Sequence, residues 1–201
     1  MDTRIQILLW VAGAYLVGGV PFGFLIGKMR GVDIRTAGSK NIGATNVYRV
    51  VGPKWGLLAF ACDFLKGFLP VFAALRVFGA ASDVPVAVGL ACVVGHTLTP
   101  YMKFKGGKGV ATAFGMLMAL IPALTGAAFL LFVVVVWLSH YISLGSCLAA
   151  LFLGVMIWVP TPLAKANLSL QVVMTLLAVF VIWKHRSNIA RLKAGTENKI
   201  Y

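Results

Sequence analysis

Apolar residues in this chain form long runs that are separated by short polar segments. The first run extends from Ile5 to Ile26, and Gln6 is its only strongly polar side chain. A helix needs roughly 20 mostly apolar residues to cross the hydrocarbon core of a bilayer, whereas the apolar core of a cleaved signal peptide has about 7–15. The run therefore predicts a first transmembrane helix over about residues 5–27.

Later runs predict helices over about residues 55–79, from about 85 to the region 96–101, and over about 168–183. Residues 109–164 contain no Asp, Glu, Lys or Arg, so they form either two long spans or three short ones. Three spans, broken near Pro122 and near residues 140–146, put the loop with Lys165 outside and the basic C-terminal segment inside, as the positive-inside rule requires. We therefore expect an all-α membrane protein, a bundle of seven transmembrane helices with the N-terminus outside and the C-terminus cytoplasmic.

The composition agrees with this class. The chain is 60% hydrophobic and 11% charged, with a mean hydropathy of +0.94, values that a water-facing surface does not allow. A net charge of +13 also fits nucleic-acid binding, but the cations lie in short segments between apolar runs, as in cytoplasmic loops. This distribution leads us to expect no nucleic-acid partner. We also expect no metal site, because the three cysteines lack the spacing of metal ligands. Asp63 and Lys66, at i and i+3 inside the second span, predict an internal ion pair.

The first loop, about residues 28–54, combines glycines with polar and basic side chains. Gly38 and Gly43 allow successive backbone N–H groups to converge on an anion. A turn-rich segment whose cations meet anionic lipid is the alternative. A Walker A pattern is absent from the sequence, which argues against nucleotide binding. The side chains that can contribute to an anion site here are Ser39, Asn41, Thr45, Asn46 and Arg49.

The second loop, about residues 96–112, contains three glycines and two lysines immediately before an apolar helix that looks short. Backbone N–H groups, the positive end of the helix dipole and full cationic charges together favour phosphate. A flexible hinge with boundary lysines is the alternative. His96 has the pKa range of an acid or base, or it is a structural residue at a helix end. The residues of this candidate site are Lys105, Gly106, Gly107, Lys108, Gly109 and Thr112.

The third segment, about residues 184–201, is a basic tail when considered alone. On one helix, His185, Asn188 and Arg191 lie at i, i+3 and i+6 and share part of a face. Glu197 follows in a tail that we expect to be mobile. Because the predicted topology puts this segment on the same side as the first two loops, it becomes the third wall of one cytoplasmic site.

Together the three segments resemble a known family. GSKNIGATNVYR, GH followed by FKGGKGVAT, and HRSNIARLKAGTE are similar to the three cytoplasmic motifs of the bacterial acyl-phosphate:glycerol-3-phosphate acyltransferases. The resemblance covers essentially the whole chain, which we interpret as one domain over residues 1–201. Two departures are visible: Lys40 stands where the family usually has Gly, and Pro100 lies one position later than usual.

The resemblance implies a multi-pass enzyme of the bacterial cytoplasmic (inner) membrane with its active site on the cytoplasmic face. It implies transfer of a fatty acyl group from acyl phosphate to the 1-hydroxyl of glycerol 3-phosphate, giving lysophosphatidic acid and phosphate in the first step of phospholipid biosynthesis. Neither a cofactor, nor CoA, nor acyl carrier protein is expected. The expected catalytic residues are Ser39, Arg49, Lys108, His185 and Asn188. The expected substrate-binding residues are Asn41, Gly43, Thr45, Asn46, His96, Lys105, Gly106, Gly107, Gly109, Thr112, Arg191 and Glu197.

Acyl phosphate already carries a good leaving group, so the site mainly has to position two anions and stabilise developing charge. Which loop binds which phosphate stays open. The base is His96, His185 or a substrate phosphate oxygen, and the scarcity of carboxylates favours the phosphate. The alternative function is a phosphate or organophosphate transporter, which would have a midplane site and inverted repeats.

Overall fold

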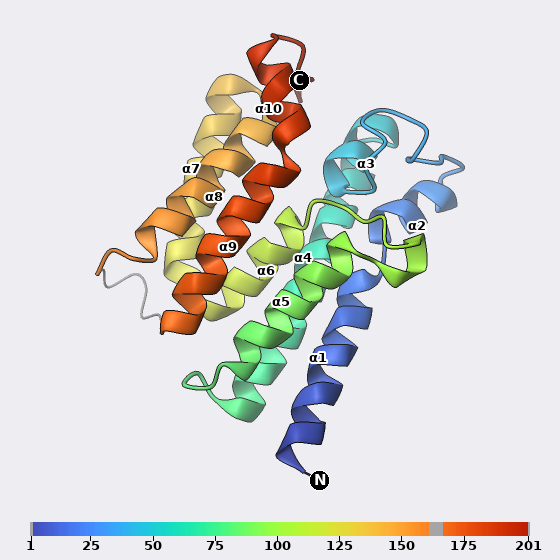
Figure 1. Cartoon of the computed structure of the whole chain (residues 1–201). Coiled ribbons are helices and arrows are strands. Elements are labelled where there is room, and N and C mark those ends of the chain that lie inside the picture. The colour runs from blue at the N-terminus through green and yellow to red at the C-terminus, as the bar shows by residue number, and fades with distance from the viewer. Residues whose placement is uncertain (1, 161–166, 201) are drawn as a thin grey trace. The chain divides into compact units, whose positions relative to one another are not determined.

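The structure is a computed structural model that describes residues 2–160 and 167–200, and in these ranges all regular secondary structure is helical (Figure 1). The external loop expected around Lys165 lies outside the described residues. The helices are α1 (Thr3–Gly19), α2 (Phe22–Met29), α3 (Ala44–Val50), α4 (Pro53–Phe78), α5 (Val84–Thr97), the 3₁₀ helix η1 (Pro100–Met102), α6 (Val110–Leu120), α7 (Pro122–Ser139), α8 (Ile142–Met156), α9 (Leu168–Lys184) and α10 (Arg186–Lys193).

The uncharged stretch after loop residue 109 forms three helices, as predicted. The first break is at Ile121, and Pro122 then starts α7, where the missing N–H of proline is not needed. The second break is at His140, whose φ of 65° is the left-handed conformation that commonly ends a helix. The expectation that the helix from Val110 to Leu120 is short is also confirmed, since it has 11 residues.

Within residues 2–160 and 167–200, four helical stretches are long and apolar enough to cross a membrane, or five if α9 and α10 count as one bent span. Those four cover residues 3–29, 53–78, 84–102 and 122–139, while α6 and α8 are shorter apolar helices. The protein is therefore a helical multi-pass membrane protein. The count of seven spans and the orientation of the termini stay predictions.

The chain divides into two compact units, unit 1 (residues 1–120) and unit 2 (residues 121–201). In unit 1, α4 packs against α5 and α6, and α5 packs against α1. The α4–α6 crossing is close because glycines face backbone across it: a Cβ at Gly67 would overlap the Thr112 carbonyl oxygen, and one at Gly115 would overlap the Phe64 carbonyl oxygen. Small residues at such crossings let helix backbones approach in a membrane.

Gly115→Ala is expected to destabilise unit 1 by about 1–3 kcal/mol, the usual range for an overpacked interior, because the new methyl group meets backbone that cannot rotate away. Thermal unfolding in detergent measures the effect. Gly13→Ala is the matched control, since no described atom lies within 4 Å of a Cβ there and alanine favours the helix. Equal unfolding temperatures for the two variants would contradict the close crossing.

At the break between α1 and α2, around Val20–Pro21, side chains donate hydrogen bonds to backbone carbonyls in addition to the Phe22 N–H, which donates to the Val20 carbonyl at 3.1 Å. The Thr99 hydroxyl donates to the Gly19 carbonyl at 2.6 Å, and the Lys66 ammonium donates to the Val20 carbonyl at 2.7 Å. Broken helices are tolerated at membrane depth only where such groups find partners. The two bonds also fix the end of α1 relative to the middle of α4 and to the segment that follows α5 within unit 1.

In unit 2, α8 packs against α7 and α9, and α10 packs against α8 and α9 (Figure 1). The axis bends by 53° between α9 and α10. The C-terminal segment then returns to the α7–α8 turn, where the Ile200 N–H donates to the His140 carbonyl at 2.9 Å.

Candidate functional site

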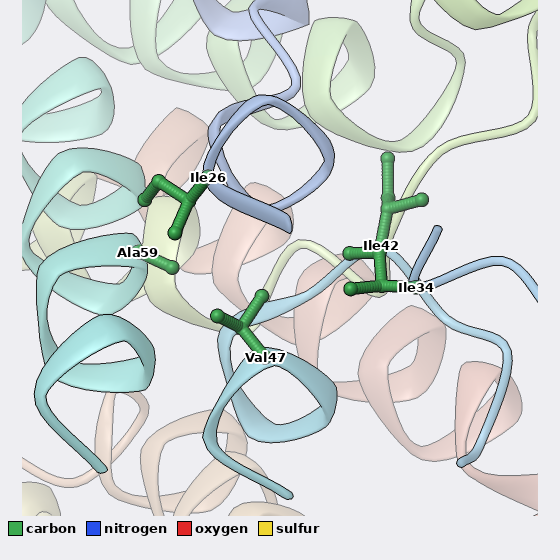
Figure 2. Packing of buried hydrophobic residues seen from close by; sticks show 5 residues of the cluster. All are labelled: Ile26, Ile34, Ile42, Val47 and Ala59. Carbon is green, nitrogen blue, oxygen red and sulfur yellow. The ribbon is translucent and has the colours of Figure 1, made fainter. Parts of the chain in front are cut away.

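Loop 1, residues 30–43, and the following α3 form a folded cap with an apolar core of their own. Figure 2 shows this core, in which Ile34 and Ile42 from the loop and Val47 from α3 meet Ile26 of α2 and Ala59 of α4. All five side chains are buried. The polar residues of the loop are therefore held on a packed support, and α3 itself is an element that the sequence interpretation missed.

Asn46 holds the turn of loop 1. Its side-chain amide donates to the Ile34 carbonyl at 2.8 Å and to the Ala37 carbonyl at 3.1 Å, and its oxygen accepts from the Ser39 N–H at 2.8 Å. Both amide hydrogens are thus used inside the loop, and the residue is 1% exposed. The structure gives Asn46 a positioning role, whereas the sequence interpretation expected a direct ligand.

The anion nest expected in loop 1 is only partly available. The N–H groups of Ser39, Lys40 and Gly43 donate to Asn46, to the Ala37 carbonyl and to the Asn41 side chain, respectively. These backbone donors fix the loop. The Ser39 side chain is exposed, and the side chains of Thr45 and Arg49 are half-buried, so side chains are the groups of loop 1 best suited to meet an anion.

The backbone conformation of Lys40 shows what the first departure from the family pattern does to loop 1. Its φ is 58°, in the left-handed region that favours glycine. A lysine here keeps the backbone conformation that glycine adopts easily, so the departure does not force a different loop path.

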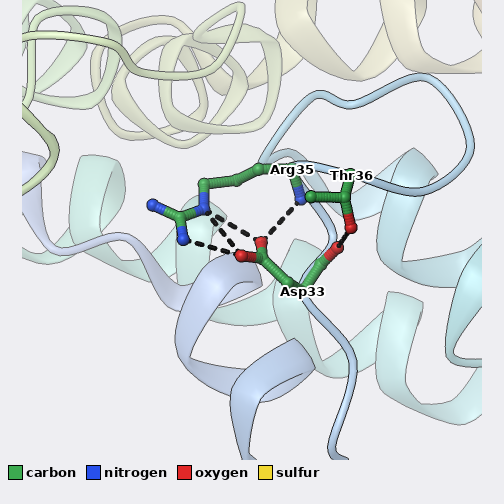
Figure 3. A network of polar contacts seen from close by, with 3 residues as sticks. All are labelled: Asp33, Arg35 and Thr36. Carbon is green, nitrogen blue, oxygen red and sulfur yellow. Dashed lines mark hydrogen bonds and ion pairs between the residues drawn. The ribbon is translucent and has the colours of Figure 1, made fainter.

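The start of loop 1 is fastened by an exposed ion pair. Figure 3 shows Asp33 with Arg35, whose guanidinium approaches the carboxylate to 2.6 Å, and with Thr36, whose hydroxyl donates to the Asp33 carbonyl at 2.9 Å. The hydrogen bonds from the Arg35 side chain and backbone lower the pKa of Asp33 from 3.8 to about 2.

Asp33 is expected to stay ionised at pH 3. Because its pKa is lowered in the folded protein, the contribution of the pair to loop stability is present above pH 3.8 and is lost as the pH falls towards about 2. A ¹³C NMR titration of the Asp33 carboxyl measures this, and Arg35→Gln should return the midpoint to the ordinary value. A midpoint near 4 in the unmodified protein would contradict the pairing.

Loop 2, residues 98–109, is fastened to the end of α5 by its glycines. The Gly106 N–H donates to the Thr97 carbonyl and the Gly107 N–H donates to the His96 carbonyl, each at 3.1 Å. A Cβ at Gly106 would overlap backbone of residues 96 and 97, and Gly109 has φ 81°. The predicted glycine pattern is thus needed to seat the loop, and these two N–H groups are not available to phosphate.

The start of α6 is the part of loop 2 that remains suited to an anion. The first N–H groups of a helix have no intrahelical acceptor, and here they follow Lys108 directly, where the helix dipole is positive. Thr112 in the first turn is fully buried, and within the described residues its hydroxyl has no hydrogen-bond partner. Lys108 is half-buried, whereas Lys105 is exposed.

The predicted ion pair of Asp63 and Lys66 is confirmed, with 2.7 Å between carboxylate oxygen and ammonium. The same oxygen, Asp63 Oδ1, lies 3.6 Å from His96 Nδ1. All three side chains are buried. The link from the pair to His96, and through His96 to loop 2, was not evident from the sequence.

The third segment differs from the predicted single helix, because the helix bends at His185. The His185 ring lies at this bend, buried, with Nδ1 2.8 Å from the Val181 carbonyl oxygen. Asn188 and Arg191 lie on α10 beyond it, and both donate to Glu197, at 2.6 and 2.7 Å.

Glu197 is buried, which corrects the expectation of a mobile tail. Its carboxylate also accepts from the Ser143 hydroxyl at 2.8 Å, a partner that was not evident from the amino-acid pattern. Burial alone would raise the pKa of Glu197, but the hydrogen bonds from Asn188, Ser143 and Arg191 outweigh it and hold the pKa below its usual value. Such a carboxylate joins α8, α10 and the tail and is poorly suited to be a base.

The structure thus gathers the predicted residues within each unit. Loops 1 and 2 lie at the same end of unit 1 (Figure 1), where α2 and α5 end and α4 and α6 begin. In unit 2, His185, Asn188, Arg191 and Glu197 lie together around α10. Within the described residues no cluster of metal-ligating side chains occurs.

Comparisons with known proteins agree on one family. The family model described as glycerol-3-phosphate acyltransferase matches residues 8–195. A glycerol-3-phosphate acyltransferase of Trichlorobacter lovleyi is 47% identical over 192 residues, covering 96% of each chain. A crystal structure of PlsY (YgiH), described as an integral membrane glycerol 3-phosphate acyltransferase in its glycerol 3-phosphate form, is 40% identical, with a TM-score of 0.91 over 96% of this chain and 95% of the other. The lysophosphatidic acid form gives 39% and 0.88 over the same shares.

Proposed function

Because the chain belongs to the glycerol-3-phosphate acyltransferase family, we propose that it uses acyl phosphate as its donor. The hydroxyl oxygen at position 1 of glycerol 3-phosphate attacks the acyl carbon, and the bond from that carbon to the phosphate oxygen breaks. Lysophosphatidic acid and inorganic phosphate are the products. No CoA, acyl carrier protein or other cofactor takes part. The enzyme acts in the bacterial inner membrane, with both substrates bound on the cytoplasmic face.

The observation that carries this proposal is the way loop 2 presents Lys108 at the start of α6. Two glycine N–H groups fasten the loop to α5, which supports the proposal because it holds the lysine and the first helical N–H groups in an arrangement suited to an anion. Fixed donors aimed at developing charge are the main source of catalysis in acyl transfer. Acyl phosphate needs such donors at its leaving group.

Each set of predicted residues is assigned a substrate group. Loop 1, through Ser39 and Arg49, and loop 2, through Lys108, take the two phosphates. His185 and Asn188 orient the glycerol phosphate. Asn46 and Glu197 act indirectly, because their polar atoms hold the loop and the C-terminal segment in place.

We assign the proton of the attacking hydroxyl to an oxygen of the departing phosphate. Three protein groups are less suited to accept it: Glu197 already accepts three hydrogen bonds, and His96 and His185 are buried. If either His96→Gln or His185→Gln lowers kcat by more than about 10³-fold, beyond a typical positioning effect and within the range of a general base, the proton passes through that histidine instead.

A donor comparison tests the proposed function. The purified protein in detergent is given glycerol 3-phosphate with acyl phosphate, acyl-CoA or acyl carrier protein thioester, and lysophosphatidic acid and free phosphate are followed. We expect equal amounts of both products with acyl phosphate alone. Product with acyl-CoA and none with acyl phosphate would overturn the donor assignment. In a second assay with the protein reconstituted into vesicles, uptake of phosphate without formation of lysophosphatidic acid would favour a transporter.

The seven-span topology is tested separately, by labelling intact cells with a thiol reagent that does not cross membranes. In a background with the native cysteines replaced, Ser82→Cys should react from outside, whereas Lys103→Cys should react only after the membrane is opened. The reverse pattern would invert the proposed orientation.

A further inference from the structure

A buried line of polar groups runs across unit 1 beneath loop 2. It begins at the Val20 carbonyl, which accepts from Lys66 Nζ at 2.7 Å. Lys66 pairs with Asp63 at 2.7 Å, and Asp63 Oδ1 lies 3.6 Å from His96 Nδ1. Asp63 is 2% exposed, Lys66 4% and His96 6%. The line therefore joins the α1–α2 break, α4 and the end of α5.

Helix packing alone does not call for these groups. Glycines already bring α4 and α6 together, and charged side chains inside a membrane protein are costly even when paired, so where they occur they commonly mark a functional site. The line ends at the face of His96 that meets loop 2. We therefore look for the function of these polar groups at the contact between His96 and loop 2.

The contact is between the imidazole and Gly107. A Cβ at Gly107 would overlap His96 Nε2 first and approach Cε1 and Cδ2 next, so the three atoms nearest to it all belong to the ring. Gly107 does not have the left-handed backbone that Gly109 has. The space taken by the imidazole is thus the reason for glycine at this position. Gly106 differs, because a Cβ there meets backbone of residues 96 and 97.

We propose that His96 is a positioning residue whose ring sets the distance between loop 2 and the end of α5, and that the Asp63–Lys66 pair holds this ring in place. Asp63 attracts the Nδ1–H edge, which fixes the ring rotation and leaves Nε2 against Gly107. Gly107 rests on this edge while its N–H is bound to the His96 carbonyl. Lys108 and the start of α6 follow immediately. The inference rests on the proposed function in that loop 2 has to bind a substrate phosphate.

A double-mutant cycle tests the contact. Gly107→Ala should lower kcat/KM by about 10²-fold, the effect of a misplacement of about 1 Å, mainly by raising the KM of the phosphate substrate that loop 2 binds. His96→Ala removes the ring and should lower kcat/KM by about 10-fold or more. The double variant should be no worse than His96→Ala alone, because the new methyl group then occupies the vacated space.

Gly106→Ala is the matched control. It should be as damaging in the His96→Ala background as in the unmodified protein, since its clash is with backbone. If Gly107→Ala is equally damaging in both backgrounds, or if His96→Ala rescues Gly106→Ala as well, the proposed contact is wrong.

The role of the ion pair is tested with both charges removed together. Asp63→Asn combined with Lys66→Met leaves no unpaired buried charge. We expect the KM of the same phosphate substrate to rise about 10-fold, while kcat changes less. The effect should disappear in the His96→Ala background, because the pair acts through that ring. An unchanged effect there would mean that the pair only stabilises the helices.

The cycle separates this inference from the proposed function. Measured by unfolding temperature in detergent, Gly107→Ala should destabilise the unmodified protein and have little effect in His96→Ala, whatever the acyl donor is. Coupling in unfolding without any transfer from acyl phosphate would sustain the contact and overturn the donor. Acyl transfer from acyl phosphate without coupling in unfolding would support the donor and overturn the contact.

Discussion

Lys108→Met should reduce kcat/KM by about 10²–10³-fold, the loss that follows removal of one fixed donor from a site of developing charge. Methionine keeps most of the apolar stem, so the half-buried side chain still fills its space, while the charge at the start of α6 disappears. The helix dipole and backbone N–H groups remain, which is why some activity should survive. Initial rates with both substrates varied give kcat and KM.

Lys103→Met is the control for this prediction. It removes the same charge from the same loop, but at an exposed residue in the turn after η1. Its activity should stay within about 3-fold of the unmodified enzyme, because exposed charges are screened by solvent and salt. If both variants lose activity equally, the net charge of the loop matters and a fixed lysine does not.

Glu197→Gln is expected to be the most disruptive single change in unit 2. The carboxylate accepts from Ser143 and Asn188 on one oxygen and from Arg191 on the other. A glutamine side chain has an NH₂ group in place of one of these two accepting oxygens. This new donor would then face another donor, so at least one hydrogen bond is lost. We expect a loss of about 3 kcal/mol, at the low end for a broken buried pair because Arg191 is partly exposed. Activity should fall with it, since Asn188 loses its support.

Arg191→Met is the companion variant and should be milder, because Ser143 and Asn188 still hold the carboxylate. The pH dependence has a definite sign. Since the pKa of Glu197 is lowered in the folded protein, its contribution is present above the ordinary pKa of a glutamate and is lost as the pH falls below it. Unfolding temperatures of the unmodified protein and of both variants, from pH 7 down to about pH 3, measure this. A Glu197→Gln protein as stable as the unmodified one would show that the tail is held by other contacts.

The helices, the breaks near Pro122 and His140, and the Asp63–Lys66 pair could be predicted from the sequence. Each depends on local information: the length of an apolar run, a proline or a left-handed residue, and a spacing of three on one helix. The sequence also contained a weak signal for α3. Ile34, Ile42 and Val47 interrupt an otherwise polar loop at intervals that suit a small core, but the glycines around them favoured an open loop.

The remaining features depend on contacts between distant residues. Ser143 and Glu197 are 54 residues apart, and Gly19 and Thr99 are 80 apart. No periodicity reports such pairs. For the same reason the sequence could not reveal that the Asn46 side-chain amide donates to backbone carbonyls of loop 1. Nor could it reveal that the N–H groups of Gly106 and Gly107 already donate to backbone carbonyls of α5. Residue types indicated phosphate chemistry, and only the fold distinguishes groups that are free to bind from groups that position them.

Lys40 and Lys103 have consequences for how the protein can be engineered. Both have the left-handed backbone, with φ of 58° and 52°, which disfavours a side chain with a Cβ by about 1–2 kcal/mol. Glycine at position 40, the residue usual in the family, would relieve this strain and remove one positive charge. These two turns are therefore a natural starting point for a more heat-tolerant enzyme, with catalytic rate as the quantity at risk.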